Sequence, residues 1–584
     1  MRVALDWACP DGGQAWRYGF DEPMAVLQAE RLDQVRPVLD AVHAHAQAGR
    51  WCVGYVAFEA APAFDDAFVV HASPSPLVWF AVFDQAQPFP TSAGRDVSTP
   101  LAHWSIPDGH AARTVFEADM AHIHQAIATG EFYQVNYTRV WQGRLLRGSP
   151  WAYFNALRCA QPGGYAAYLD TGDVQVLSVS PELFFDWDGA RLLCRPMKGT
   201  AARGDTSQSD EAHAHALRTS PKELAENVMI VDLIRNDVSR IAQPFSVKVP
   251  RLFHLEALPT LWQMTSDVCA HTRAGLTWVD AFAVLFPCGS VTGAPKVQAM
   301  KAIHALEQEA RGVYCGAIGV VRPGGAARFS VAIRTVTVQV KSLRCGIGSG
   351  ITASATAEGE WREWQHKRRF VLRASEPFEL LETFALDSGC VRHAADHWAR
   401  LTQAAAHFGW VWGPSEQAAL AQQVQALQKT HSSGLWRVRC LVNADGLARL
   451  EAFALDPSPP SVRLAWARQA LVQADSEFVR HKTTRRAHYD ALTIRSPSIF
   501  DTLLYNTAGE VTECVRGNIA AYIKGRWVTP PLVCGLLPGV GRAVALREGR
   551  LVEGVIRRDA LADVTAWAFL NSLRGWLPAT VETV

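Results

Sequence analysis

The hydrophobic pattern of the chain breaks at Ala374-Ser-Glu-Pro377, and this break constrains the fold more than any other feature of the sequence. A second, shorter block opens directly after it with Phe378-Glu-Leu-Leu-Glu-Thr-Phe384. With 584 residues, the chain is long enough to bury two full hydrophobic cores. We therefore predict two domains, residues 1–375 and 376–584.

Hydrophobic periodicity predicts both helices and strands in these blocks, which favours an α/β (α+β) fold. Helical spacing covers Val115–Gly130, Pro221–Asn236 and His393–Phe408. The stretch from Asp456 to Ser461, rich in proline and serine, is typical of a surface loop. Strands are predicted within Trp51–Phe80 and at Val174–Val179, Ala317–Val321 and Phe329–Val338.

Composition excludes several classes of function. The net charge of +1, with acidic and basic residues interleaved, gives no basic footprint for nucleic acid and no polybasic membrane stretch. The N-terminus lacks the pattern of a signal peptide, and no apolar run approaches the length of a membrane span, so we expect a cytoplasmic protein. The 12 cysteines form no C-x-x-C pair, which favours reduced thiols over a disulfide frame.

Two pairs of acidic residues, Glu223 with Glu226 and Glu360 with Glu363, have the spacing that places both members on one helix face. Taken alone, such a pair is more often a solvated helix face than a metal site. Mg²⁺ is usually held by one or two carboxylates together with oxygens of an anionic substrate. Two acidic pairs in one domain are therefore candidates for a magnesium site.

Over about residues 115–370 the chain resembles the chorismate-utilising enzymes. The matching motifs occur in the order of that family: Gly130-Glu-Phe-Tyr-Gln-Val-Asn136, Ser180-Pro-Glu182, Pro196-Met-Lys-Gly-Thr200, Glu226 to Asp237, Phe286 to Lys296, Ile333-Arg334, Gly348-Ser-Gly350 and Glu360 to Lys367. The resemblance implies a fold of large mixed β-sheets flanked by helices, with chorismate as the substrate. It also implies that Glu226 and Glu363 hold Mg²⁺, with Glu360 in the same cluster, and that Glu182 is the general acid for the departing C4 hydroxyl.

The resemblance also implies which residues bind the substrate. Arg334 and Lys367 would hold a carboxylate, and glycines at 348 and 350 would let the backbone approach it. The full set implied is Thr200, Thr292, Gly293, Arg334, Gly348, Gly350 and Lys367.

Two positions distinguish reactions within this family. Lys198 stands where anthranilate and isochorismate synthases carry alanine and 4-amino-4-deoxychorismate synthases carry lysine. Gln134 stands where isochorismate synthases carry the lysine that activates water. The resemblance therefore implies that Lys198 adds to C2 of chorismate and that ammonia then attacks C4. The alternative for Lys198 is a clamp for the anionic substrate.

Ammonia needs a source, and no segment has the cysteine elbow and downstream His-x-Glu typical of glutaminases. The resemblance thus implies a separate glutamine amidotransferase subunit. Some family members bind tryptophan in their amino-terminal part, but the first hundred residues identify no such site.

From about residue 378 to 584 the chain resembles the fold-type IV pyridoxal-phosphate enzymes, which have a two-subdomain α/β fold. The matching runs are His397 to Leu401, His481 to Asp490, Asn506 to Asn518 and Thr529 to Arg542. The resemblance implies pyridoxal 5′-phosphate as cofactor, covalently held by Lys482, with Glu513 at the pyridine nitrogen. Arg400 and the backbone at Val540 and Gly541 would hold the phosphate.

Two departures weaken this phosphate site: Val515 replaces a small hydroxyl residue and Gly541 replaces the usual threonine. Together the two resemblances imply a bifunctional enzyme that aminates chorismate and then eliminates pyruvate to give p-aminobenzoate, a folate precursor. There are two alternatives: an anthranilate synthase fused to an aminotransferase, and a synthase with an inactive dimerising second domain. A homodimer through the second domain is a further partner that the resemblance allows.

Overall fold

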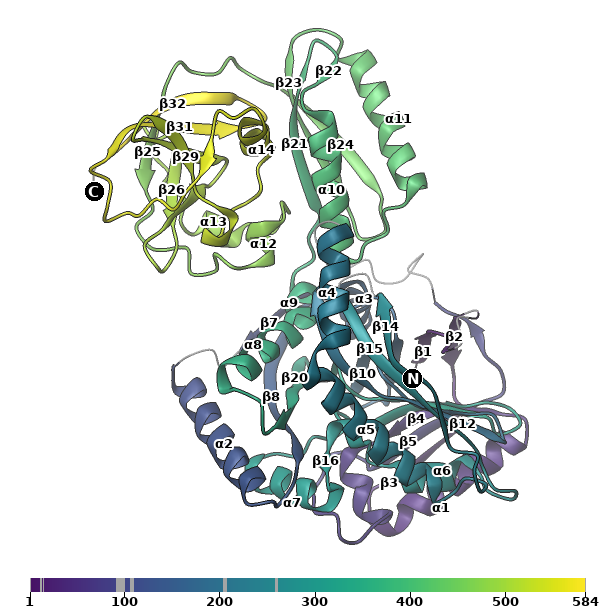
Figure 1. Ribbon diagram of the computed structural model, residues 1–584. Coiled ribbons are helices and arrows are strands. Elements are labelled where there is room, and N and C mark those ends of the chain that lie inside the picture. Colours follow the sequence, from purple (N-terminus) through teal and green to yellow (C-terminus); the bar gives the residue numbers. More distant parts are fainter. Residues whose placement is uncertain are drawn as a thin grey trace. The chain divides into compact units, whose positions relative to one another are not determined.

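A computed structural model describes most of the chain: residues 2–10, 13, 15–90, 100–105, 110–202, 207–257 and 261–582. The chain forms two compact units, Met1–Pro377 and Phe378–Val584. Helices and large sheets occur in both units, which confirms the α/β class (Figure 1). Among the described residues, no helix is both long enough and apolar enough to cross a bilayer.

The first unit contains two ten-stranded sheets. In order, the first consists of β16 (Gly293–Ala294), β8 (Gln134–Arg147), β20 (Ser342–Thr352), β19 (Thr335–Gln339), β10 (Gln175–Ser180), β9 (Tyr165–Asp170), β1 (Arg2–Trp7), β2 (Trp16–Asp21) and β6 (Gln87–Pro88), with β7 (Leu101–Ser105) paired to β8. The second consists of β13 (Met197–Ala202), β15 (Leu261–His271), β12 (Arg191–Arg195), β11 (Leu183–Trp187), β18 (Ala327–Val331), β17 (Ala317–Val321), β4 (Trp51–Val56), β5 (Val78–Phe83) and β3 (Ala25–Ala29), with β14 (Lys248–Ala257) paired to β15.

The two sheets pack face to face. Leu5 and Trp7 of the first sheet share a buried cluster with Tyr55 and Trp79 of the second. The strand pairings described in both sheets are antiparallel, so the mixed strand directions expected for this unit are wrong. Some neighbours, such as β4 and β5 or β19 and β20, follow one another directly in the chain, which antiparallel pairing allows because it needs no long crossover.

Helices cover the outer faces of this sandwich. Apolar faces of α1 (Leu32–Gln47), α5 (Pro221–Ser239) and α6 (Trp278–Leu285) pack in the cluster outside the second sheet. The cluster outside the first sheet includes α2 (His110–Ala128), α3 (Pro150–Ala160), α7 (Lys296–Leu306), α8 (Ala357–Lys367) and α9 (Arg369–Ser375). Helix α4 (Ser207–Thr219) and the short 3₁₀ turns η1 (Phe58–Ala63) and η2 (Gly289–Val291) complete the unit.

One predicted strand is wrong. Phe329–Val338 is not continuous: β18 ends at Val331 in the second sheet and β19 begins at Thr335 in the first. Arg334, between them, has a φ of 51°, a left-handed conformation that a strand does not accommodate. The chain therefore crosses between the sheets at a residue expected to bind substrate.

The second unit has two lobes (Figure 1). In the smaller lobe α10 (Ala394–Phe408) and α11 (Pro414–Thr430) pack on a sheet ordered β22 (Cys390–Val391), β21 (Leu380–Asp387), β23 (Leu435–Val442) and β24 (Ala448–Ala454). Residues 455–461 form the expected loop to the second lobe. Its sheet is ordered β27 (Val511–Cys514), β26 (Asp501–Tyr505), β25 (Val462–Trp466), β32 (Gly575–Val581), β31 (Val564–Asn571), β28 (Asn518–Ile523), β29 (Arg526–Thr529) and β30 (Val552–Glu553).

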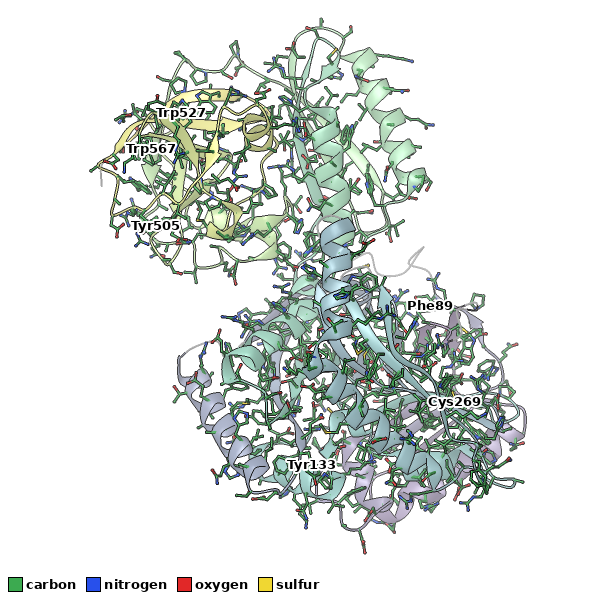
Figure 2. The ribbon with its side chains drawn as sticks, viewed as in Figure 1. Phe89, Tyr133, Cys269, Tyr505, Trp527 and Trp567 are labelled. Atoms are coloured by element: carbon green, nitrogen blue, oxygen red, sulfur yellow. The ribbon has the colours of Figure 1, made fainter. Side chains whose placement is uncertain are left out.

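Large aromatic side chains fill the sheet of the second lobe. Tyr505 and Trp567, labelled in Figure 2, each meet Trp466 of its core edge to face, and Trp527 meets Trp576 in the same way. The short helices α12 (Glu477–Arg480) and α13 (Ala487–Asp490), the turn η3 (Leu532–Cys534) and α14 (Val540–Arg547) surround the sheet. These elements carry the matched runs of the second block.

Candidate active sites

Lys198 lies in a β-bulge. Met197 of β13 pairs with Thr265 of β15, but Thr200 pairs with Gln263, so two residues of β13 oppose one of β15. Gly199 takes a φ of 85°, which glycine adopts without strain. Bulges re-aim side chains, and here the bulge separates Lys198 from the regular alternation of its strand.

The amine of Lys198 points at the opposite sheet, next to Gly350 of β20. A Cβ atom added at Gly350 would lie 2.9 Å from Lys198 Nζ and 2.6 Å from Gln134 Nε2, so these two side chains and the Gly350 backbone converge. Gln134 is fully buried, and neither its amide nitrogen nor its amide oxygen has a hydrogen-bond partner. Buried amides left unpaired are costly, so this one is suited to a bound molecule.

Glu182 is buried beside the same space. Burial raises its pKa to about 7, against the opposing effects of Ser290 and Lys198. Its Oε1 atom has no protein partner. A carboxyl group that keeps its proton near neutral pH can act as a general acid.

The segment from η2 to β16 closes the wall near Gln134. Thr292 donates its hydroxyl hydrogen to Cys288 O at 3.0 Å, and its carbonyl accepts from Asn136 N–H at 2.7 Å. Gly293 passes so close to Gln134 that an added Cβ would lie 2.1 Å from the Gln134 carbonyl oxygen. Thr292 and Gly293 thus shape the site through their backbone, whereas Thr200 is exposed on β13 beyond the bulge.

The predicted carboxylate binders meet at α8. Arg334 donates to Lys367 O at 2.7 Å, and Lys367 Nζ donates to Gly348 O at 2.9 Å while pairing with Glu363 at 2.6 Å. Burial lowers the pKa of Arg334. Two cations beside the glycine-rich strand β20 can hold an anionic substrate.

The predicted magnesium ligands line α5 and α8. Glu360 accepts from Ser349 Oγ at 2.5 Å, and Glu226 lies 3.9 Å from Lys222. Burial raises the pKa of Glu226 and of Glu360, the latter also through Glu363. Within the ranges that the structure describes, no three His, Cys, Asp or Glu side chains are assembled closely enough to hold a metal. Because Mg²⁺ needs only one or two protein carboxylates beside substrate oxygens, the donor set fits it nonetheless.

The second unit holds a half-buried lysine, Lys482, and a buried glutamate, Glu513. Burial, with Arg486 and Arg400 nearby, lowers the pKa of Lys482 to about 7. Burial raises the pKa of Glu513 to about 7, although Tyr489 donates to its Oε1 at 2.6 Å. A lysine that is readily neutral can form a covalent bond to an aldehyde, and a buried carboxylate can pair with a pyridine nitrogen.

Arg400 is clamped by Glu382. Arg400 donates to both Glu382 oxygens, at 2.8 and 2.6 Å, and to Pro538 O at 3.2 Å, just before α14. His397 Nδ1 lies 2.7 Å from Glu382 Oε2. A guanidinium group beside the N-terminus of a helix suits a phosphate, so Arg400 and α14 fit the cofactor expected there.

Packing explains the departure at Gly541. A Cβ atom there would lie 2.7 Å from Asn571 C and 3.0 Å from Ser572 N, both backbone atoms. Threonine therefore does not fit in this arrangement. Thr512, which precedes Glu513 on β27, has a fully buried hydroxyl without a partner among the described residues.

Four residues at these sites escaped the sequence interpretation: Gln263, Glu382, Arg486 and Tyr489. Arg486 donates to Val515 O at 2.6 Å and stacks over Tyr489. Arg486 and Tyr489 lie within the run matched to the cofactor lysine, so their spacing from Lys482 was a usable signal. Glu382 gave only the weaker signal of an acidic residue in an apolar strand.

Each unit matches a known protein family. Residues 106–373 match the family of chorismate binding enzymes, and residues 379–581 match amino-transferase class IV. Aminodeoxychorismate synthase component 1 of Salmonella typhimurium is 36% identical over 286 residues, which are 49% of this chain and 63% of that protein. Anthranilate synthase component 1 of Aquifex aeolicus is 34% identical over 261 residues, 45% of this chain and 53% of that protein. The chain thus spans less than two thirds of the length of either relative.

A solved structure shares the fold of the first unit. The crystal structure of anthranilate synthase component I from Streptococcus pneumoniae has a TM-score of 0.52 at 22% identity, covering 64% of this chain and 92% of that one. The chain therefore joins a domain of the chorismate-binding enzyme family to a domain of the class IV aminotransferase family.

Proposed function

We propose that this chain converts chorismate to p-aminobenzoate in two steps, one on each unit. The observation that carries the proposal is the convergence of Lys198, Gln134 with its unpaired amide, and Gly350. They lie beside Glu182, whose carboxyl has a raised pKa. An amine within bonding reach of a bound ring, next to a general acid, suits substitution of a hydroxyl group. The relatives named aminodeoxychorismate synthase component 1 support this assignment.

In the first step, Lys198 Nζ adds to C2 of chorismate while Glu182 gives its proton to the C4 hydroxyl, which leaves as water. Ammonia then attacks C4 and expels the lysine amine, so the product is 4-amino-4-deoxychorismate. Gln134 is not a base that could activate water, and this favours ammonia as the nucleophile. Mg²⁺ would be held by Glu226 and Glu363, with Glu360 in the same cluster, and would neutralise the charge of a substrate carboxylate. The carboxylate itself would be bound by Arg334 and Lys367.

In the second step, pyruvate is eliminated and the ring becomes aromatic. Bound pyridoxal phosphate supplies an electron sink for this chemistry. Lys482 would hold the cofactor and carry the proton lost from C4, Glu513 would face the pyridine nitrogen, and Arg400 with the backbone at Val540 and Gly541 would hold the phosphate. Burial of Lys482 keeps its amine available as a base near neutral pH.

Partners follow from this chemistry. Ammonia would come from a separate glutamine amidotransferase subunit, and a homodimer through the second unit stays a prediction, as does the cytoplasmic location. The anthranilate synthases among the relatives favour one competing product, anthranilate. Lys198 opposes that alternative, since those enzymes resemble this chain but carry alanine there.

One incubation tests the proposal. The purified chain, chorismate, ammonium, Mg²⁺ and pyridoxal phosphate should give p-aminobenzoate and pyruvate by liquid chromatography. Omitting pyridoxal phosphate from cofactor-stripped protein should let 4-amino-4-deoxychorismate accumulate. Anthranilate as the main product would contradict the first step, and 4-amino-4-deoxychorismate that persists with cofactor present would contradict the second.

A further inference from the structure

We infer that Gln263 is a positioning residue for Lys198, acting by locking the β-bulge that aims the lysine; the inference rests on the proposed amination. Gln263 lies on β15, opposite the bulge, and its side chain is buried. Its amide contacts the backbone of Gly199, the residue after Lys198.

The amide nitrogen of Gln263 joins the two strands at the bulge. It donates to Gly199 O on β13 at 3.0 Å and to Met264 O on β15 at 3.2 Å. A bulge disrupts the regular ladder and leaves the extra residue unpaired. Both hydrogens of this one amide are thus used to hold the backbone where the ladder is interrupted.

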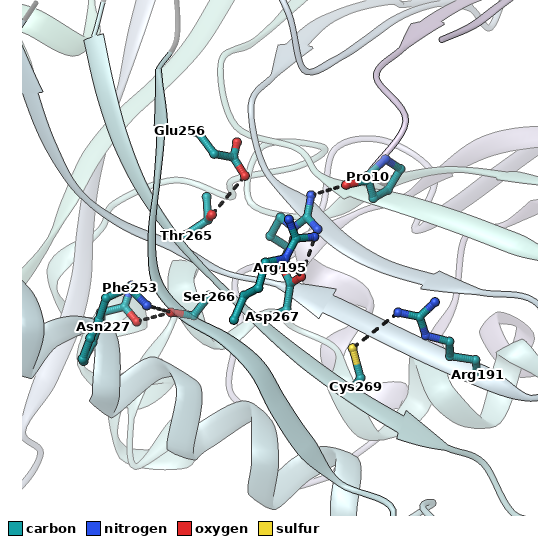
Figure 3. Close-up of polar contacts among 11 residues, drawn as sticks. Pro10, Arg191, Arg195, Asn227, Phe253, Glu256, Thr265, Ser266, Asp267 and Cys269 are labelled. Carbon is teal, nitrogen blue, oxygen red and sulfur yellow. Dashed lines mark hydrogen bonds and ion pairs between the residues drawn. The ribbon is translucent and has the colours of Figure 1, made fainter. Parts of the chain in front are cut away.

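The chain is also fixed on the other side of Lys198. Ser266 N–H donates to Pro196 O at 3.1 Å. Arg195 pairs with Asp267 at 2.6 and 3.0 Å and also donates to Pro10 O, as Figure 3 shows. Ser266 in turn donates to Asn227 of α5 (Figure 3). Lys198 therefore lies between residues 195–196, which are fixed by the Arg195–Asp267 ion pair and the Ser266–Pro196 hydrogen bond, and Gly199, which accepts a hydrogen bond from the Gln263 amide.

The direction of Lys198 depends on this bulge. Along a strand, successive side chains point to opposite faces, and one extra residue reverses the face of those that follow. Gly199 also approaches α5 closely, because an added Cβ would lie 2.9 Å from Glu223 Oε2. Loss of the Gln263 amide would let the bulge shift and move Lys198 Nζ away from Gly350 and Gln134.

The test compares three variants in the full chain. Gln263→Met removes the donor with little change in length, and Gln263→His retains a side-chain N–H. Gln243→Met is the control for loss of an amide-to-carbonyl hydrogen bond, at an exposed residue. Gln243 also donates to a backbone carbonyl, Thr272 O at 3.1 Å, but far along the sheet from the bulge. Amination is followed with saturating ammonium, and the second unit is checked with supplied 4-amino-4-deoxychorismate.

We expect Gln263→Met to lower kcat for amination about 10- to 100-fold, since displacement of a reacting group by about 1 Å has effects of this size. KM for chorismate should stay near the wild-type value, because the groups proposed to bind its carboxylate are unchanged. Gln263→His should recover part of kcat. Gln243→Met should match the wild type in kcat, and all variants should retain the second reaction.

Wild-type kcat in Gln263→Met would overturn the inference, as would an equal loss in Gln243→Met. If Gln263→Met melts at a lower temperature than the control, a further variant, Gln263→Asn, separates positioning from stability. This variant keeps the amide but shortens its reach to Gly199 O, so a normal kcat in it would also overturn the inference. Absence of amination in the wild type would instead refute the proposed function, so the two failures are distinguishable.

Discussion

Replacing Glu382 with glutamine should destabilise the smaller lobe of the second unit and loosen Arg400. Glu382 is 2% exposed, and it accepts from both Arg400 and His397. Although burial opposes ionisation, Arg400 and His397 lower the pKa of Glu382 to about 2. The variant Glu382→Gln removes the charge but keeps the shape, so it isolates the electrostatic contribution.

The size of the effect follows from that pKa. A fall from 4.5 to about 2 corresponds to roughly 3 kcal/mol of stabilisation of the ionised form. Breaking a buried ion pair by removing one partner costs about 3–5 kcal/mol, which agrees. Because the pKa is lowered in the folded state, this stabilisation is complete above pH 4.5 and is lost as the pH falls toward 2.

Native-state hydrogen exchange on cofactor-free protein measures the free energy of local opening, in peptides from β21 and α10. Glu382→Gln should lower the free energy of opening there by about 3 kcal/mol at pH 7. The control is Glu379→Gln on the same lobe, whose exposed pair with Arg449 should contribute below about 1 kcal/mol. Equal, small changes in both variants would refute the role given to Glu382.

Four further outcomes are expected. Lys198→Ala should abolish 4-amino-4-deoxychorismate formation without unfolding the first unit, measured by product analysis and thermal melting; normal turnover would exclude the covalent role. A chelator should stop the first reaction and spare the second, and equal survival of both would contradict the magnesium assignment. Lys482→Ala should lose the visible absorbance band of the bound cofactor together with p-aminobenzoate release, while amination continues. Because Glu182 must be protonated to act as an acid, kcat/KM for amination should fall as the pH rises through about 7, and a flat profile there would argue against it.

The candidate catalytic residues could be proposed from the sequence where the chemistry expected of them requires one residue type in a recognisable run. Lys198 and Lys482 are of this kind, since few side chains form the bonds proposed for them. The structure adds that Lys198 meets Gln134 and Gly350, from strands far apart in the sequence.

Unlike Arg486 and Tyr489, Gln263 was not predictable, because its role arises from strand register. Gln263 matters only because β13 bulges opposite it, and a bulge at Lys198 and Gly199 has no reliable signature in one sequence. The error at Phe329–Val338 has the same origin. Its apolar residues satisfy the pattern of one strand, but the left-handed turn at Arg334 assigns its two halves to different sheets.

The segment that carries Lys482 is joined to the smaller lobe by main-chain hydrogen bonds. Leu381 N–H donates to Lys482 O at 3.0 Å, and Thr484 N–H donates to Glu379 O at 2.9 Å. The same lobe carries Arg400 and Glu382 on α10 and β21. The reactive amine and the arginine expected at the phosphate are therefore mechanically coupled. A hinge motion that separated the lobes would have to break these two hydrogen bonds or move Lys482 together with Arg400. If both residues hold the cofactor, such a motion would therefore change both contacts at the same time.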